Sequence, residues 1–257
     1  MQEGKQNRLA VLYEGQGELS CYEDLAEKLN MPLLTTDELT VSHNVQAYLS
    51  WRNGSLILLD ASAINKPGIT VEIEHRQGEQ RSWPIAKTDA LAQALGRKTK
   101  TVVDATAGWG QDSLAMFRMG YEVTCIERSP IMAELLADGF KRLKNQDWII
   151  KLNLNPPQLI TGNAIEILAQ LPKQPDCIYL DPMFPPKRKK SALAKKSIMV
   201  LRDLIGDDAD KEDLFITAFK VVGKRVVVKC PDYAEPLGGK PSESFQGKLI
   251  RYDVYFK

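Results

Sequence analysis

The sequence predicts an α/β protein built as a three-layer sandwich, with a mostly parallel sheet of about seven strands between two layers of helices. Two observations predict this fold. After residue 80, short apolar runs with strand character alternate with longer amphipathic segments, and several of the apolar runs end at a polar residue. The pattern before residue 80 differs and predicts a small α+β unit. We therefore expect two domains, residues 1–80 and residues 81–257.

The first domain combines strand, helix and hairpin patterns. Residues 8–15 are a candidate strand, and residues 21–30 have the apolar spacing of a helix. Residues 45–62 hold two apolar runs separated by Asn53-Gly54, a dipeptide that favours hairpins. Residues 69–75 alternate apolar and polar side chains, which predicts another strand. No residue here has catalytic character, so we expect this unit to serve packing or substrate orientation.

The second domain follows a polar stretch that ends at Pro84. Residues 86–96 predict a helix that stops at Gly96. The strand-like runs are residues 102–106, 122–128, 158–162, 176–182, 225–230 and 249–256. The helical segments are residues 112–120, 129–145, 163–171, 197–206 and 211–222. A short connection rich in Pro and Gly joins the last two strands, so we expect the final strand to be antiparallel.

Composition and charge exclude several functional classes. The chain has 257 residues, is 44% hydrophobic and carries a formal charge of +1, so a polyanion would bind a local basic patch rather than the whole surface. No apolar run approaches the roughly 20 residues of a membrane helix, and the N-terminus lacks the apolar stretch of a signal peptide. We expect a cytoplasmic protein that does not bind membranes.

Metal and disulfide chemistry are not expected. The cysteines have no C-x-x-C spacing and three lie in apolar runs, so we expect buried free thiols. They are Cys21, Cys125, Cys177 and Cys230. His43 and His75 have no second metal-binding residue at helical or hairpin spacing, which argues against a zinc site.

The end of the first strand of the second domain has the pattern of a ligand loop. Glycines allow a sharp turn and a close backbone approach, and the helix that follows offers unpaired N–H groups suited to an amino-acid carboxylate. The candidate cofactor-binding residues here are Asp104, Gly108, Gly110, Gln111 and Asp112. Ser113 occupies the third glycine position of a dinucleotide-binding loop, so NAD is disfavoured.

Polar residues end the next two strands. Glu127 lies about twenty residues beyond the loop, where an acid accepts hydrogen bonds from ribose hydroxyls, and Arg128 follows it. The alternative is a strand-end acid that caps the next helix. Asn163 and Ala164 follow the third strand, where an amide or a backbone N–H would contact an adenine edge; Gly162-Asn163 is equally an ordinary turn pair.

The fourth strand ends in Asp181-Pro182-Met183-Phe184, followed by two more prolines. An exocyclic base amine is a poor nucleophile because its lone pair is delocalised into the ring. The Asp181 carboxylate and a rigid backbone carbonyl at Pro182 would orient that amine, and Phe184 would stack on an accessible or flipped base. We therefore take Asp181, Pro182 and Phe184 as the candidate catalytic residues. The alternative is a proline-rich loop without function.

A basic run follows this corner directly. It suits RNA phosphates, although such runs are often solvated surface. Its basic residues are Lys187, Arg188, Lys189, Lys190, Lys195 and Lys196. Lys229, at the end of the fifth strand, is either a further RNA contact or a surface residue.

Taken together, the motifs resemble the Rossmann-like class I S-adenosylmethionine (SAM)-dependent methyltransferases over roughly residues 99–257. The loop DATAGWGQD and the corner DPMFP, which is similar to the D/N-P-P-Y/F signature of exocyclic-amine methylases, are central to this resemblance. With IERSP, PPKRKKSALAKK and RVVVKCPDYAEPL they resemble the ribosomal RNA small subunit methyltransferase J family more narrowly.

That resemblance implies SAM as cofactor and methyl transfer to the N2 amine of one guanine near the 3′ end of 16S ribosomal RNA. The implied partner is small-subunit ribosomal RNA or a ribosomal particle. The implied cofactor contacts are Gln111, Asp112, Glu127, Arg128, Asn163, Ala164 and Asp181. Two alternatives stay open: an adenine-N6 or protein-glutamine methyltransferase, and a non-catalytic RNA-binding assembly factor that has kept the fold.

Overall fold

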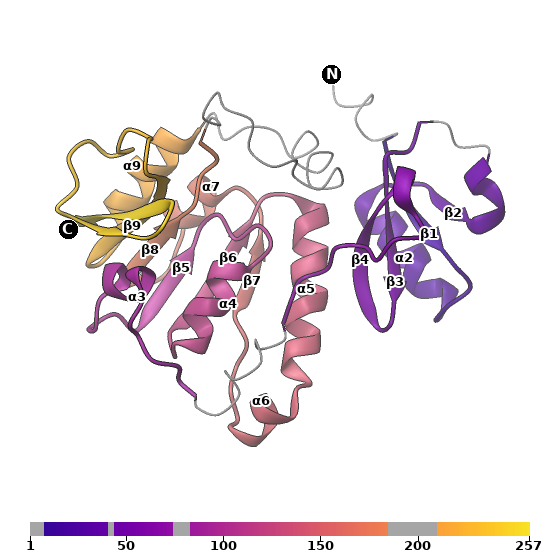
Figure 1. Cartoon of the computed structure of the whole chain (residues 1–257), viewed down its shortest axis with the longest axis horizontal. Helices are drawn as coiled ribbons and strands as arrows, with labels where there is room; N and C mark the ends of the chain where they lie inside the picture. Colours follow the sequence, from indigo (N-terminus) through magenta and orange to yellow (C-terminus); the bar gives the residue numbers. More distant parts are fainter. Residues whose placement is uncertain (1–7, 41–43, 74–82, 185–209) are drawn as a thin grey trace. The chain divides into compact units, whose positions relative to one another are not determined.

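The structure, a computed structural model, describes residues 8–40, 44–73, 83–184 and 210–257 (Figure 1). The chain divides into two compact units. The described residues up to Val71 belong to unit 1, and those from Glu72 onward belong to unit 2. The predicted helix at residues 197–206 lies outside the described residues.

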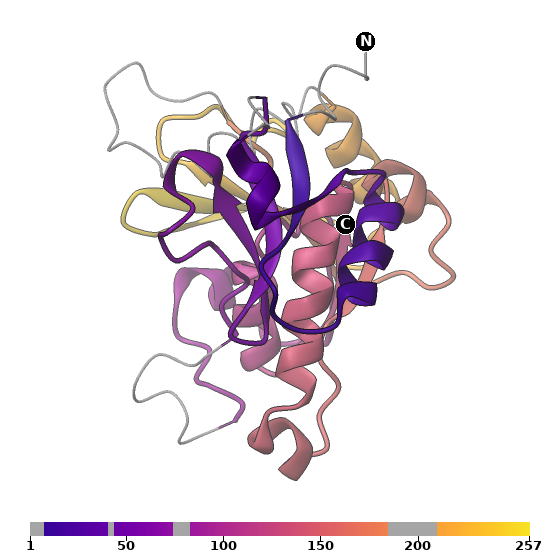
Figure 2. The same cartoon turned by 90° about the vertical axis from the view of Figure 1, so that its right-hand side faces the viewer.

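Among the described residues, unit 1 contains a four-stranded sheet in the order β2-β1-β3-β4. Its strands are β1 (Leu9–Tyr13), β2 (Leu33–Thr35), β3 (Ala47–Arg52) and β4 (Ser55–Asp60). Strand β1 is parallel to both of its neighbours, while β3 and β4 are antiparallel. Helix α2 (Leu19–Leu29) runs beside the strands (Figure 2). Its Tyr22 ring meets Tyr13 and Trp51 edge to face, which anchors the helix to the sheet.

The hairpin predicted in unit 1 is confirmed. Asn53 and Gly54 join β3 to β4 with φ of 51° and 72°, and positive φ at both central residues is what a tight hairpin turn requires. The strand predicted from residue 69 is wrong for its described part, where only Ile69 bridges to Leu58. Val71 is nevertheless fully buried, so the alternating pattern there reflects burial without strand pairing.

Unit 2 contains a seven-stranded sheet in the described residues, in the order β10-β11-β9-β8-β5-β6-β7. The strands are β5 (Thr101–Asp104), β6 (Glu122–Glu127), β7 (Gln158–Thr161), β8 (Cys177–Leu180), β9 (Arg225–Pro231), β10 (Glu243–Gln246) and β11 (Ile250–Phe256). Strands β5 to β9 are parallel, and β11 is antiparallel to both β9 and β10. The antiparallel last strand is therefore confirmed, whereas β10 was not predicted.

Helices cover both faces of this sheet. They are α3 (Ala90–Leu95), α4 (Gln111–Arg118), α5 (Pro130–Lys144), α6 (Asp147–Lys151), α7 (Ala164–Ala169) and α9 (Lys211–Val221). Helices α7 and α9 share one apolar cluster with Val103, Ile126 and Ile178 of the strands. On the other face, Ser113 of α4 bonds to Asp104 of β5. The three layers predicted from the alternating pattern are thus present (Figure 1).

The predicted start of α5 and the predicted end of α3 are also confirmed. The side chain of Ser129 accepts a hydrogen bond from the Met132 N–H at the start of α5. Helix α3 begins at Ala90 and not at the predicted residue 86, because the Asp89 side chain caps it by accepting the Ala92 N–H. Gly96 ends α3 with φ of 79°. The four cysteines are free thiols; Cys125, Cys177 and Cys230 are buried, whereas Cys21 is exposed on α2. Among the described residues, every helix is too short or too polar to cross a membrane.

Candidate active site

The predicted site residues of unit 2 gather where the parallel strands end. Strand β5 lies at the centre, the chain proceeds outward through β6 and β7 on one side, and it returns to β8 and β9 on the other. Ligands of open α/β sheets bind beyond the carboxyl ends of the strands at such a reversal of strand order. The side chains at this edge are therefore the candidate site.

Asp104 ends β5 and lies inside the protein. It is 1% exposed, and its carboxylate accepts hydrogen bonds from the Ser113 hydroxyl and, at 3.1 Å, from the Thr106 N–H. Burial raises the pKa of Asp104 to about 7, and the nearby carboxylates of Asp112 and Asp181 contribute to the rise. Because it is buried, Asp104 holds the loop in place and does not present its carboxylate to a ligand.

Glu127 ties the glycine loop to the end of β6. One carboxylate oxygen accepts the Gly108 N–H at 2.8 Å, and the other accepts the Ser129 N–H at 2.7 Å. Gly108 and Gly110 have φ of 51° and 70°, so the loop needs glycine at both positions. Glu127 therefore orders the loop and the start of α5.

A second network joins the start of α4 to the ends of β8 and β9. The Lys229 ammonium lies 2.7 Å from Asp112 Oδ2 and 2.9 Å from Asp181 Oδ2. The buried Tyr179 hydroxyl donates to the same Asp112 oxygen at 2.6 Å. Burial and the Asp112 carboxylate raise the pKa of Tyr179 well above its usual value, so this hydroxyl stays a donor.

The catalytic corner predicted at the end of β8 is positioned from both sides. The Asp181 N–H donates to Thr106 Oγ1 at 2.6 Å, which joins this corner to the glycine loop. The Asp181 side chain is 39% exposed, whereas Pro182 is buried. Phe184 packs partly against the apolar cluster of α7 and α9, with the Lys211 ammonium 5.0 Å from its ring centroid.

The other predicted cofactor residues follow the same strand ends, and their side chains have different surroundings. Gln111 is exposed at the first turn of α4. Arg128 pairs with Asp210 at 3.3 Å, and Asn163 caps α7 by accepting the Ile165 N–H. The side chain of Ala164 is buried, so only its backbone is suited to a ligand contact. The basic run from Lys187 to Lys196 lies outside the described residues, as do Pro185 and Pro186.

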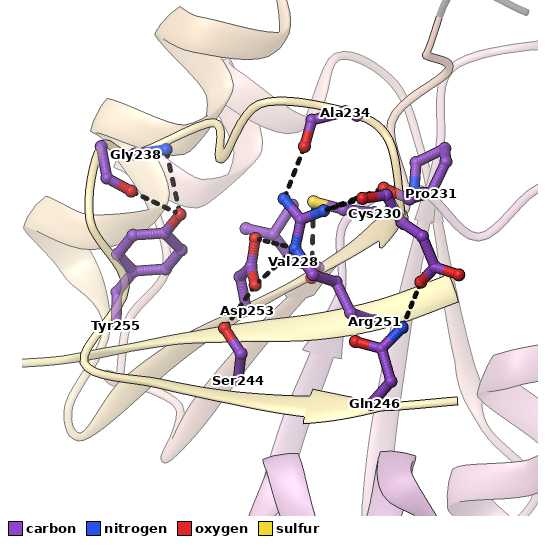
Figure 3. Close-up of polar contacts among 12 residues, drawn as sticks. Val228, Cys230, Pro231, Ala234, Gly238, Ser244, Gln246, Arg251, Asp253 and Tyr255 are labelled. Carbon is purple, nitrogen blue, oxygen red and sulfur yellow. Dashed lines mark hydrogen bonds and ion pairs between the residues drawn. The ribbon is translucent and has the colours of Figure 1, made fainter. Parts of the chain in front are cut away.

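The segment after β9 is fixed by Arg251 of β11 (Figure 3). Its guanidinium donates to the carbonyls of Pro231 at 3.0 Å and Ala234 at 2.7 Å, and it pairs with fully buried Asp253 at 2.9 Å. Ser244 of β10 donates to the same carboxylate at 2.7 Å. These bonds make the chain that continues from Lys229 a rigid border of the site.

Sequence reasoning missed three residues that build the site. Thr106 and Ser113 hold Asp181 and Asp104, and Tyr179 holds Asp112. One signal was available for Tyr179: it lies two residues before Asp181 on the same strand, so both side chains project from one face of the sheet. Nothing in the spacing of Thr106 or Ser113 indicated their partners.

Comparison with known proteins agrees with this geometry. Residues 32–257 match the protein family described as "Putative SAM-dependent methyltransferase". A ribosomal RNA small subunit methyltransferase J from Thioalkalivibrio sulfidiphilus is 39% identical over 256 residues, which cover 96% of this chain and 97% of that protein. The chain belongs to the ribosomal RNA small subunit methyltransferase J family. A protein of the same name from Shewanella sp. (strain MR-4) is 43% identical over 192 residues, or 74% of this chain and 72% of that protein.

A solved structure confirms the fold. The crystal structure of a SAM-dependent methyltransferase from Neisseria gonorrhoeae matches with a TM-score of 0.65 and 25% identity, and the match covers 96% of this chain and 95% of that one. The predicted three-layer methyltransferase fold is therefore correct, and this methyltransferase depends on SAM.

The residues at the sheet edge fit such a cofactor. A side chain added at Gly108 would meet nothing closer than the Thr106 carbonyl at 3.8 Å, so the loop leaves room on that side. The Glu127 carboxylate lies beside that loop, and a carboxylate is the type of acceptor that suits ribose hydroxyls. The start of α4 adds free N–H donors for a carboxylate.

Proposed function

We propose that this methyltransferase transfers a methyl group to the N2 amine of one guanine in 16S ribosomal RNA. The names of its relatives support ribosomal RNA of the small subunit as the substrate. The observation that carries the proposal is the corner at Asp181, which is joined to the glycine loop through Thr106 and leaves its carboxylate accessible. An acceptor at this place suits an amine that must be oriented toward the donor.

The proposed catalytic residues act on the amine and on the base. The Asp181 carboxylate accepts an N–H of the amine, which turns the nitrogen lone pair out of conjugation with the ring. Pro182 keeps the backbone carbonyl of the corner rigid, and the half-buried ring of Phe184 stacks on the base. As the amine becomes acidic during the reaction, its proton passes to Asp181 or to water.

The cofactor supplies an electrophilic methyl group when it is bound. Glu127 is proposed to accept its ribose hydroxyls, and the N–H groups at the start of α4 to bind its carboxylate. The other proposed contacts with the cofactor are Asp104, through the loop that it holds, Gly108, Gly110, Gln111, Asp112, Arg128, Asn163, Ala164 and Asp181. The proposed RNA contacts are Lys187, Arg188, Lys189, Lys190, Lys195 and Lys196, which would make binding salt-sensitive.

The test is methylation of small ribosomal subunits taken from cells that lack this protein. Wild-type enzyme with SAM should produce N2-methylguanosine, identified by mass spectrometry of the digested RNA. Asp181→Ala should lower turnover about 10²- to 10⁴-fold while SAM binding, measured by calorimetry, stays detectable. Asp147→Ala is the matched control, because Asp147 is an exposed carboxylate at the start of α6.

Each alternative has its own outcome in this assay. Undiminished turnover by Asp181→Ala would remove Asp181 from the mechanism. N6-methyladenosine in the RNA, or methylglutamine in the ribosomal proteins, would replace guanine as the acceptor. RNA binding without heat from SAM titration would point to a non-catalytic assembly factor.

A further inference from the structure

We infer that Lys229 is a positioning residue, whose ammonium holds the carboxylates of Asp112 and Asp181 together and keeps Asp181 ionised. The inference rests on the proposed function for the role of Asp181 toward the substrate amine. It differs from the RNA-phosphate role that the sequence suggested for Lys229.

The contacts of Lys229 point inward. Its ammonium has three N–H donors, and the two carboxylates at 2.7 Å and 2.9 Å take two of them. The side chain is 22% exposed. One N–H donor and little exposed surface therefore remain for an RNA phosphate, whereas both ion pairs are formed with residues of the candidate site.

Lys229 also links three elements that are far apart in the sequence. It projects from β9, Asp181 follows the neighbouring strand β8, and Asp112 lies in the first turn of α4. Tyr179 of β8 adds a third contact by donating to Asp112. One ammonium group thus connects the Asp181 carboxylate to the start of α4.

The charge balance explains why a cation is needed there. The carboxyls of Asp104, Asp112 and Asp181 converge on this region, and the negative charges of Asp112 and Asp181 contribute to the raised pKa of the buried Asp104. The hydroxyls of Tyr179 and Tyr252 also face it, and these side chains stay neutral because burial raises their pKa, that of Tyr252 to about 12. Among the described residues, Lys229 is the cation in contact with this group.

Lys229 remains charged in this setting. Burial lowers the pKa of Lys229, but the carboxylates of Asp181 and Asp112 outweigh that effect and raise it overall. An ammonium this close to Asp181 favours the carboxylate form, and only that form accepts an N–H from the amine through either oxygen. Loss of the positive charge should therefore impair Asp181 most at low pH.

The direct experiment is carboxyl ¹³C NMR of aspartate-labelled protein in the absence of RNA, across a pH titration. Lys229→Met should raise the pKa of Asp181 by about one to three units, and Lys229→Arg should leave it within half a unit of wild type. Lys229→Gln, which keeps a hydrogen-bond donor without the charge, should behave like Lys229→Met and serves if the methionine variant does not fold. An unchanged Asp181 titration in both neutral variants would overturn the inference.

Kinetics at saturating SAM provide the second measurement. The acid limb of the turnover profile should move upward in Lys229→Met by the same amount as the Asp181 titration. Adding Asp112→Asn should bring it partly back, because one of the repelling carboxylates is gone. A merely structural role would not yield this recovery. If Lys229 instead contacts an RNA phosphate, Lys229→Met would lower the slope of log K for RNA binding against log salt concentration by about one, and the pH profile of turnover would not move. That result would also overturn the inference.

The NMR measurement separates this inference from the proposed function. If no methylated guanosine forms with wild-type enzyme, the function fails, yet the titration of Asp181 still decides the role of Lys229 in the network.

Discussion

The buried carboxyl of Asp104 gives the sharpest quantitative prediction. Burial raises its pKa from 3.8 to about 7; the hydrogen bond from Ser113 partly opposes the rise, and the Asp112 carboxylate adds to it. Asp104 is enclosed at the end of the central strand, so water cannot stabilise its charge. We predict that Asp104→Asn, which keeps the shape and removes the charge, makes unit 2 less sensitive to rising pH.

The sign follows from proton binding. Between pH 3.8 and about 7 the folded state holds a proton on Asp104 that the unfolded state has lost, so the contribution of this group to stability falls as pH rises through that range. The pKa difference of about three units corresponds to about 4 kcal/mol in total. About 2–3 kcal/mol of this falls between pH 5 and pH 8.

The assay is urea unfolding at pH 5, 6, 7 and 8, followed by tryptophan fluorescence. A Trp51→Phe background removes the one tryptophan of unit 1, so the signal reports unit 2. The free energy of unfolding of Asp104→Asn should gain about 2–3 kcal/mol relative to the parent protein from pH 5 to pH 8. A difference between the two proteins that stays constant with pH would refute the reasoning, because Asp104 would then carry no extra proton.

Two further predictions concern the loop and the border of the site. Gly110→Ala should destabilise unit 2 by about 1–3 kcal/mol, because its Cβ would lie 2.6 Å from Leu136 Cδ2 and its φ is 70°. Urea unfolding should show a smaller cost of this change in a Leu136→Ala background; an equal cost would exclude the clash. Arg251→Met should cost about 3 kcal/mol in the same assay, because it leaves the carboxylate of Asp253 buried without its partner. Adding Asp253→Asn should recover part of that loss, and no recovery would show that the backbone contacts of Arg251 dominate.

The sequence predicted the sheet because apolar strands and amphipathic helices differ in period, and both periods persist over whole elements. Elements that are short or weakly apolar were not predicted from the sequence. Strand β10 has the sequence ESFQ, and most of its residues are exposed. It forms because it pairs with the edge of β11. Helix α6 spans five residues between turns. At residues 69–73 the sequence predicted a strand that does not form, because the burial of alternate side chains there gives a strand-like pattern.

The sequence predicted at which edge of the sheet the candidate site lies, but not which side chains contact each other there. Parallel strands bring their carboxyl ends to one side, so the residues that follow Asp104, Glu127 and Leu180 had to be neighbours. The pairing of Lys229 with Asp112 and Asp181 depends on strand order and on the turn of α4, and these partners are 117 and 48 residues away. No local pattern in the chain encodes that distance.

The core of unit 2 determines on which face of the sheet the Asp181 carboxylate emerges. Side chains alternate along β8, so Ile178 and Leu180 enter the apolar cluster of α7 and α9, whereas Tyr179 and Asp181 project to the opposite face. A shift of one residue would turn Asp181 into the apolar layer and remove Leu180 from it. The burial of two aliphatic side chains therefore opposes such a shift, and the same packing that stabilises the sheet keeps Asp181 beside Lys229.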